Sequence, residues 1–168
     1  KSALTDSVIF KGDDNKYYEQ VGKSDKEITE EIAFDLPNGW SWCRLKDICS
    51  IFTGATFKKE ETVTTKEGVR ILRGGNISPF ELRIKDDDIF LTKDKVKEDI
   101  ILKENDILTP AVTSLENIGK MVRVNSDMPN TTVGGFVFII RLYLKNQWLS
   151  KYILYLLSSP FMIDFMKS

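Results

Sequence analysis

Four polar loops carry the side chains best suited to contacts with another molecule. Three of them combine lysine or arginine, which bind phosphate, with asparagine, serine or threonine, which exchange hydrogen bonds with base edges; the fourth, at residues 129–132, offers only asparagine and threonine. The residues we predict to contact DNA are Thr56, Lys58, Lys59, Arg73, Asn76, Thr113, Ser114, Asn117, Lys120, Asn130 and Thr131. Composition leaves an alternative open at each loop, which is an ordinary solvated turn.

Catalytic patterns are scarce. With no histidine in 168 residues, the chain has no Ser-His-Asp or Cys-His nucleophile and no imidazole-bound zinc. The one Asp-x-Lys spacing, residues 14–16, lies in a polar segment and is interpreted as a solvated turn rather than a nuclease metal site. Residues 86–88, three aspartates, fit a solvated strand edge better than a cation site. We expect no enzyme activity, metal or cofactor of its own, with a small enzyme as the least favoured alternative.

The charge is unevenly distributed. Lys and Arg number 24 against 25 Asp and Glu, for a net charge of −1, which argues against a stand-alone duplex binder. Residues 1–35 hold 5 basic and 9 acidic residues, whereas residues 36–168 hold 19 and 16. We therefore predict an acidic lead-in arm at 1–35, extended or mobile, and a separate domain at 36–168.

The loops need a scaffold of strands between helices. Leu45, Ile48, Cys49 and Phe52 follow helical spacing, which predicts a short helix ending at residues 53–54. Apolar, β-branched runs predict strands at 69–73, 89–91, 106–109, 119–124 and 133–142, with one or two helical turns at 93–99. Helical spacing returns from 149 to 157, and Ser159-Pro160 begins a second helix. We predict an α+β fold: a twisted, mixed or antiparallel sheet with an N-terminal short helix and C-terminal helices.

A turn at residues 36–39 precedes Trp40 and Trp42, which are predicted to share one face and supply core area. Cys43 and Cys49 are predicted to be buried free thiols, and Arg44 to have a packing or salt-bridge role rather than a phosphate contact. No apolar run approaches the length of a membrane span. These features indicate a cytoplasmic protein.

An ordered set of motifs resembles one family. Residues 36–48 (LPNGWSWCRLKDI) look like the opening of target recognition domains in the specificity subunit of type I restriction-modification enzymes. The resemblance continues through 53–56 (TGAT), 71–77 (ILRGGNI), 105–108 (NDIL), 118–120 (IGK), 134–136 (GGF), 152–157 (YILYLL) and 159–161 (SPF), and upstream through 14–19 and 28–32. Phe57 stands where the family commonly has proline.

The resemblance implies that residues 36–168 form a DNA target recognition domain, a non-catalytic reader of double-stranded DNA. Its implied partners are methyltransferase (modification) subunits, which methylate adenine with S-adenosylmethionine, and a restriction subunit, which translocates and cuts DNA. A second recognition domain or a homodimer is a further implied partner, and no membrane is involved. Because the family's spacer-helix motif does not follow Ser159-Pro160-Phe161, we expect one recognition domain, truncated before the spacer.

One alternative function remains open. Tyr152, Ile153, Leu156, Phe161 and Phe165 could form an apolar surface that docks on another subunit of a DNA-modifying complex. In that case the chain would be a protein–protein interaction module and the polar loops would make no direct DNA contact.

Overall fold

The structure is a computed structural model and describes residues 6–111 and 114–167. Its chain forms two compact units, Lys1–Cys49 and Ser50–Ser168. The boundary predicted from composition, between residues 35 and 36, lies within the first unit.

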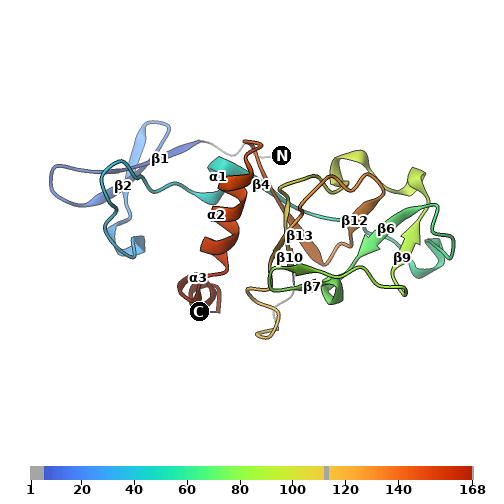
Figure 1. Ribbon diagram of the computed structural model, residues 1–168. Helices are drawn as coiled ribbons and strands as arrows, with labels where there is room; N and C mark the ends of the chain where they lie inside the picture. Colours follow the sequence, from blue (N-terminus) through green and yellow to red (C-terminus); the bar gives the residue numbers. More distant parts are fainter. Residues whose placement is uncertain (1–5, 112–113, 168) are drawn as a thin grey trace. The chain divides into compact units, whose positions relative to one another are not determined.

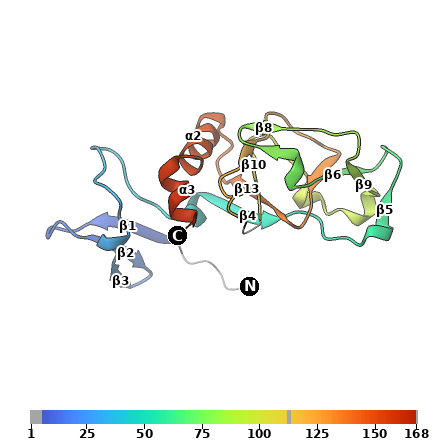
Figure 2. The ribbon, with the colours of Figure 1, turned by 90° about the horizontal axis from the view of Figure 1, so that it is seen from below.

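The strands and helices follow one another along the chain as shown in Figures 1 and 2. The strands are β1 (Ser7–Lys11), β2 (Tyr17–Val21), β3 (Ser24–Glu27), β4 (Cys49–Thr53), β5 (Thr62–Val63), β6 (Val69–Leu72), β7 (Ile77–Ser78), β8 (Glu81–Leu82), β9 (Ile89–Leu91), β10 (Ile107–Pro110), β11 (Val122–Arg123), β12 (Thr131–Val133) and β13 (Val137–Leu142). The helices are α1 (Leu45–Ile48), α2 (Gln147–Leu157) and α3 (Pro160–Lys167), with 3-10 turns η1 (Thr29–Glu31), η2 (Lys59–Glu61), η3 (Gly74–Asn76), η4 (Lys93–Lys95) and η5 (Glu98–Ile100).

The first unit contains a three-stranded antiparallel sheet in the order β1-β2-β3. Asn15 and Gly22 adopt positive φ angles of 64° and 63° in the turns that join these strands. The Phe10 and Tyr18 rings stack across β1 and β2 with centroids 5.8 Å apart. The prediction of an extended or mobile arm is therefore wrong, because its turn-forming residues connect short strands that pair with one another.

Arg44 holds the first unit together by ion pairs, as predicted. Its guanidinium donates to both carboxylate oxygens of Glu19, with Nη2 2.6 Å from Oε2, and also lies 2.8 Å from Glu31. Hydrogen bonds from Arg44 lower the pKa of Glu19 from 4.5 to about 2. The ionised form of Glu19 therefore stabilises the folded unit.

The stability of the first unit is expected to fall in acid because of this pair. A carboxyl whose pKa is lower in the folded chain contributes stability above its unfolded pKa, and this contribution is lost between pH 4.5 and about 2. The Trp148→Phe variant leaves Trp40 and Trp42, both in the first unit, as fluorescence reporters during urea unfolding. In this background the Glu19→Gln protein should be less stable at pH 7 than the protein that keeps Glu19. Its free energy of unfolding should also fall less between pH 5 and pH 3. Equal losses in the two proteins would contradict the assignment.

Two predictions about the segment before β4 are wrong. The Trp40 side chain is 57% exposed, whereas Trp42 is half-buried and packs on Phe34 with ring centroids 5.1 Å apart. Cys43 is exposed; Cys49 is buried, and burial raises the pKa of its thiol to about 11. Residues 40–44 form neither strand nor helix, so strand spacing places neither indole there.

The helix predicted to end at residues 53–54 ends at Ile48, and β4 follows directly. Cys49 to Thr53 are extended because β4 pairs with β13 at the edge of a four-stranded sheet, β11-β10-β13-β4. Gly54 then passes so close to β12 that a Cβ would collide with the Val133 carbonyl oxygen. Sheet pairing thus overrides the helical spacing of this segment.

The second unit packs two four-stranded sheets around an apolar core. The second sheet, β12-β6-β9-β5, is mixed, because β12 runs parallel to β6 while the other pairs are antiparallel. Both ribbon views place the β10–β13 sheet between the C-terminal helices and the β6–β9 sheet (Figures 1 and 2). The largest buried cluster is Leu72, Ile77, Leu102, Leu108, Val122, Val124, Val133, Val137 and Ile139. The predicted α+β class is confirmed.

The C-terminal helices are confirmed as predicted. Asn146 caps α2, since its side-chain oxygen accepts hydrogen bonds from the N–H groups of Trp148 and Leu149. The buried Ser150 hydroxyl donates to the Asn105 carbonyl at 2.8 Å, which ties α2 to the loop before β10. No helix in the described part of the chain is long and apolar enough to cross a membrane.

Candidate nucleic-acid interface

The loop after β6 is organised by Asn76, whose side chain is buried. Its Oδ1 accepts a hydrogen bond from the Arg73 N–H at 2.8 Å, and its Nδ2 donates to the Arg83 carbonyl at 2.8 Å and to Asp88 at 2.6 Å. Both ends of the Asn76 amide therefore bond to groups of the protein itself, and the residue is 1% exposed. The prediction that Asn76 contacts a base is wrong, because its amide is fully used in holding the Gly74–Gly75 turn in place.

Asp88 extends this network into the sheet. Its carboxylate accepts hydrogen bonds from Arg70 at 2.8 Å and from the Lys85 N–H at 2.9 Å. Burial raises the pKa of Asp88, but the hydrogen bonds from Lys85, Asn76 and Arg70 together bring it below its usual value. Of the three aspartates predicted to be solvated, Asp86 and Asp87 are exposed and Asp88 is buried, which corrects the third. The sequence conceals this because a carboxylate run does not show which member faces inward.

The loop before β11 is held by its own side chains. Asn117 donates to the Ser114 hydroxyl at 2.6 Å and accepts from the Lys120 ammonium at 2.9 Å. Gly119 adopts φ +85°, and a Cβ at that position would collide with Ile163 of α3. Asn117 and Lys120 are therefore positioned both by the loop and by the helix behind it.

These two loops meet at a groove of about 320 Å³ on the second unit. Asn117 and Lys120 line one part of it, and Gly74 and Gly75 line another. The remaining lining residues are Ile77, Ser78, Pro110 and Phe136. Thr56 does not line the groove but lies beside the turn that carries Phe136, because its Oγ1 would be 3.1 Å from a Cβ on Gly135. The structure thus brings two of the four loops predicted from the sequence together at the groove.

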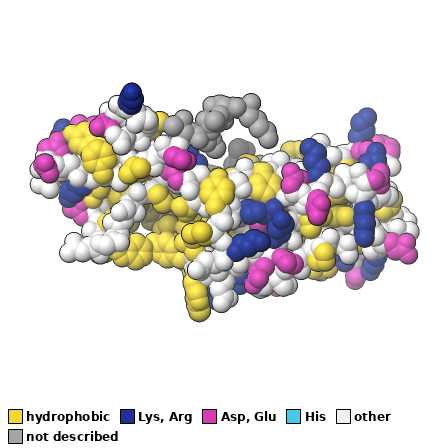
Figure 3. All heavy atoms as spheres, turned by 90° about the horizontal axis from the view of Figure 1, so that it is seen from above, with side chains coloured by type: hydrophobic (Ala, Val, Ile, Leu, Met, Phe, Trp, Pro, Cys, Tyr) yellow, Lys and Arg dark blue, Asp and Glu magenta, His cyan; other side chains and the backbone are white. Residues whose placement is uncertain are grey.

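Positive charge borders the groove. Within the described residues, no carboxylate lies within 4 Å of the ammonium groups of Lys120 or Lys85, and Lys85 Nζ lies 3.4 Å from the Cβ position of Gly75. Arg73 is half-exposed, and its guanidinium lies 3.9 Å from the Asp87 carboxylate, which is a long distance for an ion pair. On the face of the second unit that Figure 3 shows, Lys and Arg are interspersed with Asp and Glu. The groove therefore offers cations that an anionic ligand can reach.

Other predicted contacts lie away from the groove. Lys58 and Lys59 are exposed at the turn η2, a short distance along the chain from Thr56. Asn130 is exposed and Thr131 is buried, both at the start of β12, whereas Phe136 follows its far end. Thr113 lies outside the described residues. DNA binding at these positions stays a prediction.

Sequence reasoning missed two residues beside the groove. Phe136 stood out only as part of the Gly-Gly-Phe motif, and no pattern in the sequence marks Lys85. The glycines before Phe136 were an available signal, because paired glycines after a strand often allow a tight turn to present the next side chain. Lys85 reaches the groove only through the fold, since ten residues separate it from Gly75 along the chain.

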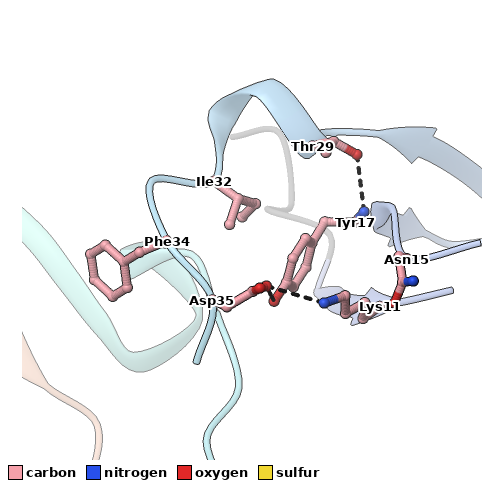
Figure 4. Close-up of a pocket in the computed structure, with 7 residues that line it drawn as sticks. All are labelled: Lys11, Asn15, Tyr17, Thr29, Ile32, Phe34 and Asp35. Atoms are coloured by element: carbon pink, nitrogen blue, oxygen red, sulfur yellow. Dashed lines mark hydrogen bonds and ion pairs between the residues drawn. The ribbon is translucent and has the colours of Figure 1, made fainter. Parts of the chain in front are cut away.

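A second hollow, of about 450 Å³, lies in the first unit (Figure 4). Its lining residues are Lys11, Asn15, Tyr17, Thr29, Ile32, Phe34 and Asp35. Asp35 accepts hydrogen bonds from the Lys11 ammonium and the Tyr17 hydroxyl, both at 3.1 Å. The Lys11 ammonium in this hollow is thus neutralised by Asp35. Of the predicted DNA contacts that the structure describes, none lines the hollow. In the described residues, no three Asp, Glu or Cys side chains are grouped so as to hold a metal ion.

Known proteins share parts of this sequence and fold. The chain is 36% identical over 104 residues, 60% of its length, to the Escherichia coli type I restriction enzyme EcoAI specificity subunit. It resembles the HsdS subunit of Thermoanaerobacter tengcongensis with a TM-score of 0.59 and 17% identity, over 81% of this chain. A chain of the type I R-M system, described for its complex assembly and conformational transition, matches 74% of this chain with a TM-score of 0.52 and 20% identity. No protein-family model matches.

The match covers part of each relative. The chain spans 17% of the Escherichia coli subunit and 31% and 29% of the two solved chains. At 17% and 20% identity, the solved structures establish the fold, and the curated relative carries the likeness in sequence. The resemblance to a target recognition domain of type I specificity subunits is thereby confirmed.

Proposed function

We propose that this chain is a DNA target recognition domain of a type I restriction-modification specificity subunit. In this role it selects a DNA sequence, and partner subunits methylate adenine or cleave DNA there. The chain itself performs no chemical step and needs no cofactor. Its partners are double-stranded DNA, the modification subunits and the restriction subunit, with a second recognition domain or a second copy completing the site, and it works in the cytoplasm.

The observation that carries the proposal is the groove where Gly74–Gly75 meets Asn117 and Lys120. Glycine allows a sugar-phosphate backbone to approach the protein backbone closely. The ammonium groups of Lys85 and Lys120 can neutralise phosphates, while the Asn117 amide and the Ser78 hydroxyl offer hydrogen bonds to bases. This arrangement supports a polyanion with readable edges as the ligand.

Replacing Lys85 and Lys120 with alanine is expected to weaken DNA binding and reduce its dependence on salt. Removing one lysine–phosphate interaction should flatten the plot of log affinity against log salt by about 0.9, so the double variant should reduce the slope by about 1.8 units. The measurement is fluorescence anisotropy of a labelled duplex between low and moderate salt. A matched control is Lys16→Ala, whose ammonium pairs with Glu27 at 3.0 Å in the first unit.

The same titration tests Lys58 and Lys59. A smaller slope in the Lys58→Ala/Lys59→Ala protein would add the η2 turn to the interface, and an unchanged slope would remove it.

If the Lys85→Ala/Lys120→Ala protein keeps the slope and affinity of the parent chain, the groove does not bind phosphate.

The exposed face of α2 and α3 favours a second candidate function, a protein-interaction module. Phe161 and Phe165 are 51% and 69% exposed, and Tyr152 and Leu156 also face outward. Ile153, included in this surface from the sequence, is buried at 4% exposure and belongs to the core. The two functions are compatible. Anisotropy with duplex DNA, before and after adding a modification subunit, distinguishes them, because a pure interaction module contributes no DNA affinity to the complex.

A further inference from the structure

Phe136 is the most exposed of the large apolar side chains in the described residues, at 80%. It lies at the tip of the turn between β12 and β13 and lines the groove. An aromatic ring so exposed to water gains nothing for folding. What sets Phe136 apart from other exposed apolar residues is that it lines the groove, where a ligand can reach the ring.

The backbone beneath Phe136 is fixed from several sides. The Ala111 N–H donates to the Phe136 carbonyl at 2.8 Å, and the Val137 N–H closes the turn onto the Gly134 carbonyl at 3.1 Å. The Gly134 N–H donates to the Leu72 carbonyl at 2.8 Å, which anchors the turn on β6. The backbone that presents the ring therefore loses little conformational entropy when a ligand binds.

The surroundings of Phe136 define the ligand chemistry. Lys120 lies in the same groove, and Lys85 borders it beside Gly75, so an apolar ring and groups that bind phosphate share one groove. On the base edges of duplex DNA, the principal apolar group is the 5-methyl group of thymine, which lies in the major groove. An apolar contact there discriminates thymine from cytosine and from uracil.

We propose that Phe136 is a specificity-determining residue that contacts a thymine methyl group in the target DNA. The inference rests on the proposed function, because it assigns a contact within the same groove. Removing a methyl group that contributes about 0.8 kcal/mol corresponds to a roughly fourfold lower affinity.

The test starts from sites selected by the protein out of a random duplex pool at low salt. Each thymine of the enriched site is then replaced by deoxyuridine, and affinities are measured by anisotropy. The affinity of the parent protein should fall roughly fourfold at one thymine position. Phe136→Ala should bind the thymine site more weakly and bind the thymine and uracil versions equally. Phe136→Ala should also keep the parent's melting temperature, since the ring is exposed.

Trp148→Ala is the matched control, because Trp148 is 69% exposed and does not line the groove. It should retain the parent's sensitivity to uracil. The proposal is overturned if Phe136→Ala retains that sensitivity, if the parent shows none at any thymine, or if the enriched site contains no thymine. A parent protein that enriches no sequence refutes the proposed function itself, and the Phe136 contact with it.

Discussion

Asp106→Ala is expected to destabilise the second unit by about 3–5 kcal/mol, since it removes a buried carboxylate and leaves Arg141, whose side chain is only 20% exposed, without its counter-ion. The Asp106 carboxylate is 1% exposed and forms two hydrogen bonds with Arg141, at 2.8 Å and 2.7 Å. It also accepts from the Lys103 N–H at 2.8 Å. Arg141 in turn donates to the Asp99 and Ile101 carbonyls, so the loss of Asp106 disturbs the whole turn before β10.

Hydrogen exchange in the β10 and β13 peptides measures this effect locally. A destabilisation of about 3–5 kcal/mol should lower protection by roughly two to four powers of ten. The matched control is Glu81→Ala, whose partner Arg83 lies 2.6 Å away in an exposed ion pair that contributes little to stability. Equal protection in the Asp106 and Glu81 variants would show that Asp106 does not stabilise the sheet.

The Asn105-Asp106 pair shows what a motif in the sequence can and cannot predict. Its resemblance to the family marked this segment, and the run that follows it is correctly predicted as a strand, β10. The role of Asp106 depends on Arg141, which is 35 residues away and becomes a neighbour only because β10 pairs with β13. Long-range pairing of this kind leaves no trace in local spacing.

Local periodicity predicted best where one element buries one face. α2 and α3 follow helical spacing and are confirmed, and β6 and β9 lie where β-branched runs placed them. The segment around Cys49 failed for a physical reason. Spacings of three and four residues place apolar groups on one helical face, yet the hydrogen bonds between β4 and β13 fix the same residues as a strand.

For the interface, loop composition located the groove better than it identified the contacts. Asn117 and Lys120 line the groove, but Asn76 lies beneath it, although all three appear in polar loops. Asparagine is equally suited to bind a base edge and to satisfy a turn's backbone, and the sequence alone does not separate these roles. The exposure of the amide decides between them.

Asn76→Ala is therefore expected to lower stability rather than to change base preference. The substitution removes the partners of the Arg73 N–H and the Arg83 carbonyl, and it removes one hydrogen bond from the buried Asp88 carboxylate. Leaving such groups unsatisfied costs about 1–3 kcal/mol for each. A total of about 3 kcal/mol is expected in urea unfolding, after allowing for water entering the loop.

Asn130→Ala serves as the comparison, because Asn130 is an exposed asparagine from the same set of predicted contacts. Its stability should stay within about 0.5 kcal/mol of the parent's. Asn76→Asp sharpens the test, since a second carboxylate would lie against Asp88, where the amide now donates at 2.6 Å. If Asn76→Ala instead keeps the parent's stability and enriches DNA sites with an altered base, the amide reads DNA, and the buried network does not hold the Gly74–Gly75 turn.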